Sequence, residues 1–211
     1  MSDHPHEHDH GPFQPDEDYA GELGPLEQAL RELLIEKGYF TADELRAQIE
    51  DMEGRRPENG ARFVARFWSD PAFRELALAD GKAAAEQLGI DVSVSPKIVV
   101  LENTPRLHHV VVCTLCSCYP RAILGYPPSW YKSREYRSRT VNEPRRVLAE
   151  FGTVVPDDVE VKVVDSTADC RFLVVPVRPA GTEGLSEEAL ARLVTRDAMI
   201  GVANALSPDA A

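Results

Sequence analysis

The sequence predicts an α+β protein in which a helical N-terminal arm precedes a mixed globule. Helix caps and helical spacing of apolar residues fill the first part of the chain, and short β-branched runs begin only after residue 90. The chain has 211 residues, 43% of them hydrophobic, which is enough to build a core. We expect a disordered tail over 1–20, a helical arm over 21–90 and an α+β globule over 91–211.

The predicted arm begins with two helices. Four leucines at helical spacing over 26–34 predict the first helix, which Gly38 is placed to end. Thr41 and Glu44, three residues apart, form a capping box that predicts the start of the second helix. A third helix is expected to include residues 61–68.

Two further helices are predicted from their caps. Asp70 followed by Pro71 is typical of a helix start, and we expect that helix to run to Leu88, where Gly89 ends it. Residues 186–194 predict a capped helix near the end of the chain.

The strands are predicted from β-branched runs that lie between these helices. Residues 159–163 alternate apolar and polar side chains, as a strand with one solvated face does. The predicted strands are 97–101, 109–112, 159–164 and 172–177.

The first residues of the chain form a polar tract rich in His, Asp and Pro, with almost nothing to bury, which predicts disorder. Removal of Met1 would expose the tripeptide Ser2-Asp3-His4, whose amine, two amides and imidazole form a square-planar set suited to copper or nickel. With the histidines that follow, this suggests metal capture: His6, His8 and His10. The alternative is a solvated tail that binds metal only incidentally.

The overall charge excludes several classes of partner. With 23 Lys+Arg and 35 Asp+Glu the net charge is −12, which argues against nucleic acid and anionic membrane surfaces as partners. No apolar stretch approaches the ~20 residues of a membrane span, and the first 25 residues do not resemble a signal peptide. We therefore expect a cytoplasmic protein without a membrane segment.

Charge is distributed unevenly along the chain. Residues 1–36 contain ten acidic residues and one basic one, whereas residues 121–146 contain seven basic residues and two acidic ones. The basic segment is interpreted either as a solvated face or as a docking surface for an acidic partner or an anionic group.

The four cysteines point to metal or redox chemistry. Cys113, Cys116 and Cys118 lie within six residues, and Cys170 stands alone far downstream, where we interpret it as a small buried apolar residue. Clustered cysteines in a chain without an export signal more often bind metal than form disulfides. A thioredoxin-like redox role is the weaker reading, because no matching strand and helix arrangement surrounds the Cys pair.

Zinc is one candidate ion. A structural zinc site needs four tetrahedral ligands, usually in two separated pairs. The cysteine triplet supplies three, and His108 and His109, which precede it, could be recruited for the fourth, with Cys170 as a less favoured ligand. A zinc-binding interaction module therefore stays open as the non-enzymatic alternative.

The backbone of the triplet offers a different ligand set. If the sulfurs of Cys116 and Cys118 and the amide nitrogens of Ser117 and Cys118 bind one ion, they close three fused unstrained chelate rings, and Cys113 is close enough to cap that plane. Amide nitrogens bind only after losing their protons, so the ion must be strongly Lewis acidic. Trivalent cobalt or iron satisfies this requirement better than zinc. The sixth position stays open for a ligand or a water that the ion would acidify.

The segments VVVCTLCSCYP and LGYPPSWYKSREYRSRTVNEPRRVL closely resemble the metal-bearing subunits of two related enzymes. These are the alpha subunit of nitrile hydratase and the gamma subunit of thiocyanate hydrolase. The resemblance extends over residues 26–202 and includes NTPRLHHVVV and WSDPAF. It implies a layered α-β-β-α globule after the arm, and a non-haem Fe(III) or non-corrin Co(III) ion. It also implies a separate beta-type partner subunit, whose arginines hold the oxidised sulfurs, and a metal-loading accessory protein.

The resemblance also assigns the ligands. It implies that Cys113 is the axial thiolate and that Cys116 and Cys118 are oxidised to sulfinic and sulfenic acid. Thr114 and Tyr119 match the cobalt-type motif, so Co(III) is expected and Fe(III) is the alternative.

The substrate depends on one departure from the nitrile hydratase pattern. Where those enzymes have Trp this chain has Arg121, and thiocyanate hydrolase has an Arg at that place, thought to help hold the anion. Hydration of a small nitrile is the expected activity and thiocyanate hydrolysis the alternative. The residues expected to be catalytic are Cys118, Ser117 and Arg121, although Arg121 is also compatible with a structural pairing to oxidised Cys116. The Ser117 hydroxyl either binds substrate or is present because a small residue lets the backbone turn.

Overall fold

The computed structural model describes residues 20–210, so the tail predicted over 1–20 and its proposed metal-capturing tripeptide lie outside the described residues except for Ala20. The helices are α1 Ala20–Glu36, α2 Ala42–Gly54, α3 Pro57–Ser69, α4 Pro71–Ala79, α5 Gly81–Gln87, α6 Arg121–Leu124, α7 Ser129–Lys132, α8 Arg134–Asn142, α9 Pro144–Glu150, α10 Glu187–Arg192, α11 Arg196–Ile200 and the 3-10 helix η1 Pro208–Ala210. The strands are β1 Lys97–Glu102, β2 Leu107–Val112, β3 Glu160–Asp165 and β4 Cys170–Val175.

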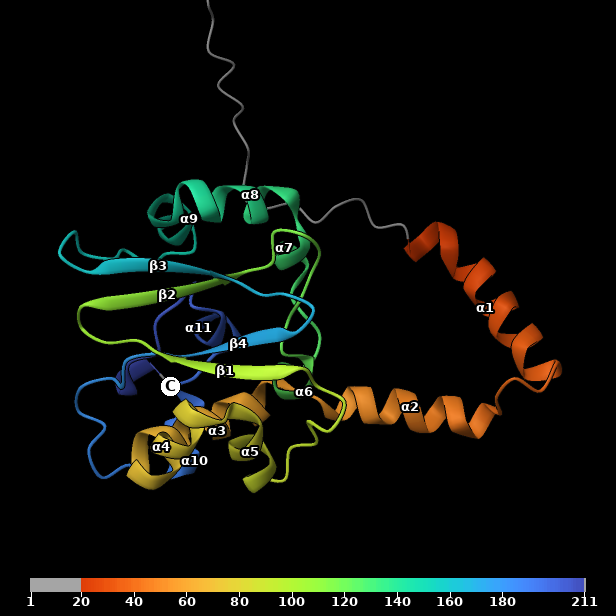
Figure 1. The fold of residues 1–211 in the computed structure, drawn as a ribbon, viewed down its shortest axis with the longest axis horizontal. Helices are drawn as coiled ribbons and strands as arrows, with labels where there is room; N and C mark the ends of the chain where they lie inside the picture. The colour runs from red at the N-terminus through yellow and green to blue at the C-terminus, as the bar shows by residue number, and fades with distance from the viewer. Residues whose placement is uncertain (1–19, 211) are drawn as a thin grey trace, which may run out of the picture.

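The globule is built from two small parallel sheets. Strand β1 pairs with β4, and β2 pairs with β3. Figure 1 shows α8 and α9 over the β2–β3 sheet and α3 to α5 over the β1–β4 sheet, with the two sheets between them. The order of layers is α-β-β-α, so the predicted α+β fold class is confirmed.

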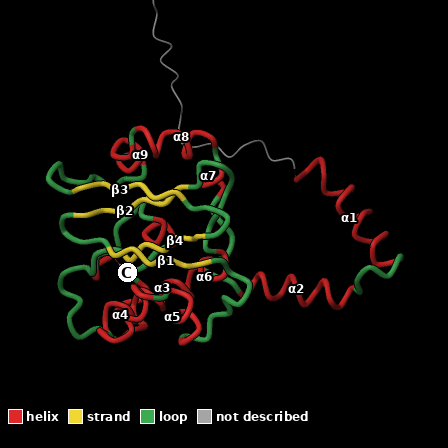
Figure 2. The backbone as a smooth tube through the Cα atoms, in the orientation of Figure 1, coloured by secondary structure: helices red, strands yellow, loops and turns green. Residues whose placement is uncertain are grey.

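Helices α1 and α2 extend away from the globule (Figures 1 and 2). The predicted capping box of α2 is present, because the Glu44 N–H donates to Thr41 Oγ1 at 3.1 Å and the Thr41 N–H donates to Glu44 Oε2 at 2.7 Å. No residue of α2 is buried, and four of the five leucines of α1 are exposed: Leu23, Leu26, Leu30 and Leu33. The arm therefore leaves a row of apolar side chains without a partner in the described chain.

Helices α3 to α5 pack on the globule. Helix α3 buries Phe63, Val64 and Phe67, and Phe63 contacts Phe73 of α4 edge-to-face with ring centroids 5.1 Å apart. The predicted limit between arm and globule at residue 90 stays a prediction. Helices α3 to α5, which lie before that limit in the chain, share the core of the globule.

The prediction of a single helix from Asp70 to Leu88 is wrong in one respect, because the chain forms two helices there, α4 and α5. Asp80 ends α4 and caps α5, since its carboxylate accepts from the Lys82 and Ala83 N–H groups at 3.0 and 3.1 Å. A Cβ at Gly81 would lie 2.7 Å from the Ile98 carbonyl oxygen, so only glycine lets α5 begin this close to β1.

The four predicted strands are present, each within about two residues of its expected limits. Short helices α6 to α9 and α11 were not predicted. None of the helices among residues 20–210 is long and apolar enough to span a membrane.

Candidate metal centre

The cysteine loop leaves the carboxyl edge of the β2–β3 sheet. Strand β2 ends at Val112, which is paired with Asp165 at the end of β3. The Ser166 N–H donates to the Val112 carbonyl at 2.7 Å, so both strands end together. Parallel strands place loops that follow them at one edge, which is where α/β proteins commonly bind ligands.

The structure brings the three clustered sulfurs together. The Cys116 sulfur lies 3.5 Å from that of Cys113 and 3.3 Å from that of Cys118, and all three fall within 4.8 Å of one another. Cys113 is buried, Cys118 is half-buried and Cys116 is exposed. The cluster therefore has one side against the protein and one side open to solvent.

The backbone amides of the loop also face the sulfurs. The Cys116 N–H donates to the Cys113 sulfur at 3.3 Å, and the N–H groups of Ser117 and Cys118 interact with the Cys116 sulfur. Neither of these two amides has another acceptor among residues 20–210. Amide nitrogens bind an ion only after losing their protons, so three sulfurs with two uncommitted amide nitrogens suit a strongly Lewis acidic ion, and the residues fit a trivalent metal.

The thiols of Cys116 and Cys118 differ in pKa. Hydrogen bonds from Cys118 and Cys113, and then from the Ser117 amide, lower the pKa of the Cys116 thiol. Burial, followed by hydrogen bonding with Cys116, raises the pKa of Cys118 to about 12. Without an ion Cys116 therefore loses its proton more readily than Cys118, and binding a metal must release the proton of Cys118.

Three neighbouring side chains hold the loop in place. Thr114 donates to the Asp165 carboxylate through its N–H at 3.0 Å and its hydroxyl at 2.5 Å. The Tyr131 hydroxyl donates to the Cys118 carbonyl at 2.8 Å, and Arg137 Nη1 donates to the Cys116 carbonyl at 3.4 Å. Sequence reasoning missed these contacts. The position of Asp165 at the end of a predicted strand was the one available signal.

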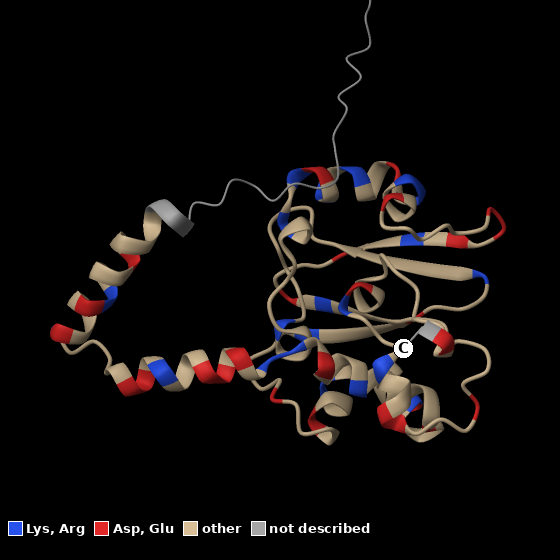
Figure 3. Cartoon of the chain, turned by 180° about the vertical axis from the view of Figure 1, so that it is seen from behind, with Lys and Arg blue, Asp and Glu red and all other residues tan. Residues whose placement is uncertain are grey.

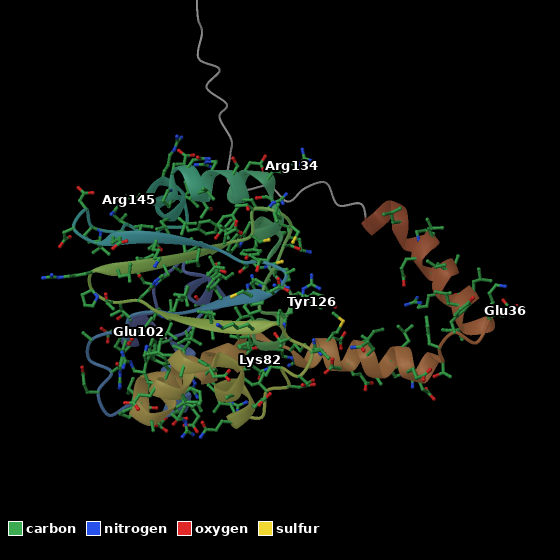
Figure 4. The ribbon with its side chains drawn as sticks, viewed as in Figure 1. Glu36, Lys82, Glu102, Tyr126, Arg134 and Arg145 are labelled. Carbon is green, nitrogen blue, oxygen red and sulfur yellow. The ribbon has the colours of Figure 1, made fainter. Side chains whose placement is uncertain are left out.

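Most nearby aromatic residues support the loop from the core. Tyr131 is fully buried and contacts Tyr119 edge-to-face at 5.3 Å between ring centroids. Trp130 packs against Tyr136 at 4.8 Å. Tyr126 is 55% exposed and lies beside the C-terminal end of α2, where its hydroxyl donates to the Met52 sulfur at 3.5 Å (Figure 4).

The two other side chains expected to be catalytic lie close to the cluster in sequence, but among residues 20–210 neither forms a hydrogen bond to its sulfurs. Arg121 is the exposed first residue of α6. Among residues 20–210 no hydrogen bond or ion pair joins its guanidinium to a sulfur, and it lines a groove with Met52, Arg55, Gly125 and Tyr126. Ser117 is half-buried, between the two outer ligands of the loop.

The remaining candidate ligands lie elsewhere. His108 is hydrogen-bonded through Nε2 to the Gly201 carbonyl at 2.7 Å, and His109 through Nδ1 to Asn103 Oδ1 at 3.0 Å. Cys170 is half-buried at the start of β4 and is not part of the sulfur cluster. In the described chain neither histidine is therefore available as the fourth ligand that a zinc site would need.

Known proteins share this chain's sequence and fold. It is 49% identical to the cobalt-containing nitrile hydratase subunit alpha of Pseudonocardia thermophila over 89% of this chain and 93% of that one. It is 47% identical to the thiocyanate hydrolase subunit gamma of Thiobacillus thioparus over 84% of this chain and 78% of that one.

Solved structures agree with these sequence matches. A recombinant thiocyanate hydrolase with partially modified cobalt centres gives a TM-score of 0.82 at 45% identity, covering 90% of this chain and 91% of that one. A double mutant of the iron-type nitrile hydratase of Comamonas testosteroni Ni1 gives 0.84 at 41% identity, covering 93% and 95%. The family described as nitrile hydratase, alpha chain, matches residues 22–203. The chain therefore belongs to the nitrile hydratase alpha-chain family.

Proposed function

We propose that this chain is the metal-bearing catalytic subunit of a nitrile hydratase-type enzyme that converts a small nitrile to its amide at a non-corrin Co(III) ion. The observation that carries the proposal is the convergence of three sulfurs with two amides that have no other acceptor in the described chain. Cobalt-containing relatives favour cobalt, and the iron-type neighbour makes Fe(III) the alternative.

The chain's own groups hold the ion and arrange the substrate. The sulfurs of Cys113, Cys116 and Cys118 and the amide nitrogens of Ser117 and Cys118 would be the ligands. A bound trivalent ion supplies Lewis acidity, which makes a carbon-nitrogen triple bond more reactive toward water. Ser117 is half-buried and lies between two of the proposed ligands, and its hydroxyl would orient a substrate on the open side.

We further propose that Cys116 is oxidised to sulfinic acid and Cys118 to sulfenic acid. Both sulfurs lie on the less buried side of the cluster, whereas Cys113 is enclosed by the core and stays a thiolate. Access of oxidant to a metal-held thiolate favours oxidation at such positions. The oxygen on Cys118 then adds a polar group beside the substrate, which makes Cys118 a catalytic residue.

A beta-type partner subunit would complete the site. The exposed Cys116 and the uncovered leucines of α1 both need another chain to exclude water. We therefore propose an enzyme that is active only as a hetero-oligomer in the cytoplasm, with an accessory protein that loads the metal.

Thiocyanate is the alternative substrate, because Arg121 adds a positive charge two residues beyond Tyr119 and a thiocyanate hydrolase subunit is among the relatives. Arg121 is exposed in this chain, so solvent screens its charge and an ion pair there would contribute only about 0–1 kcal/mol. Its preference for an anion over a neutral nitrile would become larger if the partner subunit covers it.

The test is coexpression of the chain with its genomic neighbours, followed by metal analysis, mass spectrometry of the cysteine peptide and assays on a nitrile and on thiocyanate. Cobalt with added oxygens on Cys116 and Cys118 supports the proposal, whereas zinc with unmodified cysteines would establish the binding module instead. Arg121→Trp should lower thiocyanate turnover selectively, and Arg106→Trp, at the far end of β2, is the control. Unchanged thiocyanate turnover in Arg121→Trp would remove the argument for the anion.

A further inference from the structure

A groove of about 450 Å³ lies beside the cysteine loop, on the exposed face of α8. It is connected to the metal centre by Arg137, whose guanidinium also donates to the Cys116 carbonyl. The residues that line it are Thr114, Arg134, Arg137, Ser138, Val141 and Asn142.

The groove presents two arginines that form no ion pair within the described chain, and the one carboxylate hydrogen-bonded to a lining residue is that of Asp165, held by Thr114. Among residues 20–210 neither Arg134 nor Arg137 has a carboxylate within ion-pair distance. Two residues beyond Arg137, Arg139 pairs with both Glu143 and Glu150. Arg139 is thus neutralised within the chain, whereas Arg137 donates to the carbonyls of Ser133 and Cys116 and has no carboxylate partner among residues 20–210. Figure 3 shows where the basic and acidic residues lie along α8 and α9.

The N-terminal tail has the complementary charge. Residues 1–19 contain six acidic residues, four histidines and no Lys or Arg. An extended chain covers ~3.3 to 3.6 Å per residue, so 19 residues reach roughly 60 Å, about twice the width of a small domain. In Figure 1 the chain reverses between α2 and α1, which turns the first turn of α1, where the tail attaches, back towards the α8 side.

We propose that the acidic tail of this chain docks into the groove between Arg134 and Arg137. Tethering makes the contact intramolecular, so weak charge pairs suffice where a free peptide would dissociate. Val141, which is 50% exposed in the groove, offers an apolar contact for Phe13 in the tail. Docking would bring the tail imidazoles beside the thiolates, and it does not depend on which substrate the enzyme uses.

The experiment replaces Phe13 with p-benzoylphenylalanine in the full chain, coexpressed with its partner subunit, and maps photo-crosslinks by peptide mass spectrometry. Crosslinks should concentrate in residues 134–142 at ~50 mM salt. They should fall several-fold at 1 M NaCl, where the Debye length is ~3 Å. Crosslinks to the partner, crosslinks spread over the surface, or crosslinks unaffected by salt would overturn the proposal.

Two variants identify the charges involved. Arg134→Glu with Arg137→Glu should abolish crosslinks to α8, whereas the matched reversal Arg46→Glu with Arg106→Glu should keep them. A tail with Asp16→Asn, Glu17→Gln and Asp18→Asn leaves the groove intact and should also lose most of the crosslink. This tail variant decides the question if circular dichroism shows that the α8 variant does not fold, and retention of its crosslink would overturn the proposal.

Discussion

Replacing Tyr131 with Phe should lower the stability of the fold and loosen the loop that holds the proposed metal ligands. The Tyr131 hydroxyl donates to the Cys118 carbonyl at 2.8 Å, and the ring is fully buried. Phe keeps the ring and opens no large cavity, so the substitution removes one hydrogen bond and leaves a carbonyl of the ligand loop without it. An unsatisfied buried acceptor costs about 1–3 kcal/mol, and this hydrogen bond is only part-buried, so we expect a loss of about 1 kcal/mol. For a chain of this size that corresponds to a drop of roughly 2–4 °C in the unfolding midpoint.

The same change should loosen the bound ion. The carbonyl that Tyr131 holds belongs to the residue that supplies both a sulfur and an amide nitrogen to the proposed ligand set. Removing a side chain that orients a ligand typically costs ~10–100-fold in metal affinity or activity. We expect cobalt to leave the assembled Tyr131→Phe complex correspondingly faster when a chelator is added, measured by cobalt content over time.

Tyr136→Phe is the matched control. Tyr136 is equally buried and its hydroxyl donates to the Val111 carbonyl at 2.7 Å, which lies in β2 rather than in the loop. Because its hydrogen bond is fully buried, Tyr136→Phe should lower the unfolding midpoint at least as much as Tyr131→Phe, but it should change cobalt loss much less. Equal rates of cobalt loss in the two variants would refute the view that Tyr131 orients the ligand loop.

Three further outcomes are expected. Gly125→Ala should lower the unfolding midpoint more than Gly152→Ala, because both glycines have positive φ, worth about 1–2 kcal/mol, but only at Gly125 would the added Cβ overlap the Arg55 carbonyl; equal losses would contradict this. Burial lowers the pKa of His108 below its ordinary value of 6.5, so the unfolded chain takes up the proton first. The stability that this contributes is complete above pH 6.5 and is lost as the pH falls from 6.5 to the folded-state pKa. Urea midpoints should therefore decrease from about pH 7.5 to 5, and less steeply in His108→Gln. Deleting residues 2–10 should lower the cobalt content of protein grown in metal-poor medium, and an unchanged content would end the metal-capture hypothesis.

Local signals predicted most elements because they depend on neighbouring residues. The capping box at Thr41 and the start at Asp70 are satisfied within one turn, and β-branched runs favour strands wherever they pair. The break at Asp80 was missed because its cause is the approach of Gly81 to β1, a contact between segments distant in sequence. Helices α6 to α9 are too short for periodicity to reveal.

The sequence by itself determined the proposed ligand set, because three cysteines and the amides between them lie within six residues and chelate geometry over so short a span depends only on the local chain. The tertiary structure decided what surrounds that set. Parallel pairing of β2 with β3 brings Asp165 to the loop, and burial places Tyr131 behind it. Such contacts join residues 13 to 51 positions apart in the chain, and no local pattern encodes them because they arise only when the layers pack.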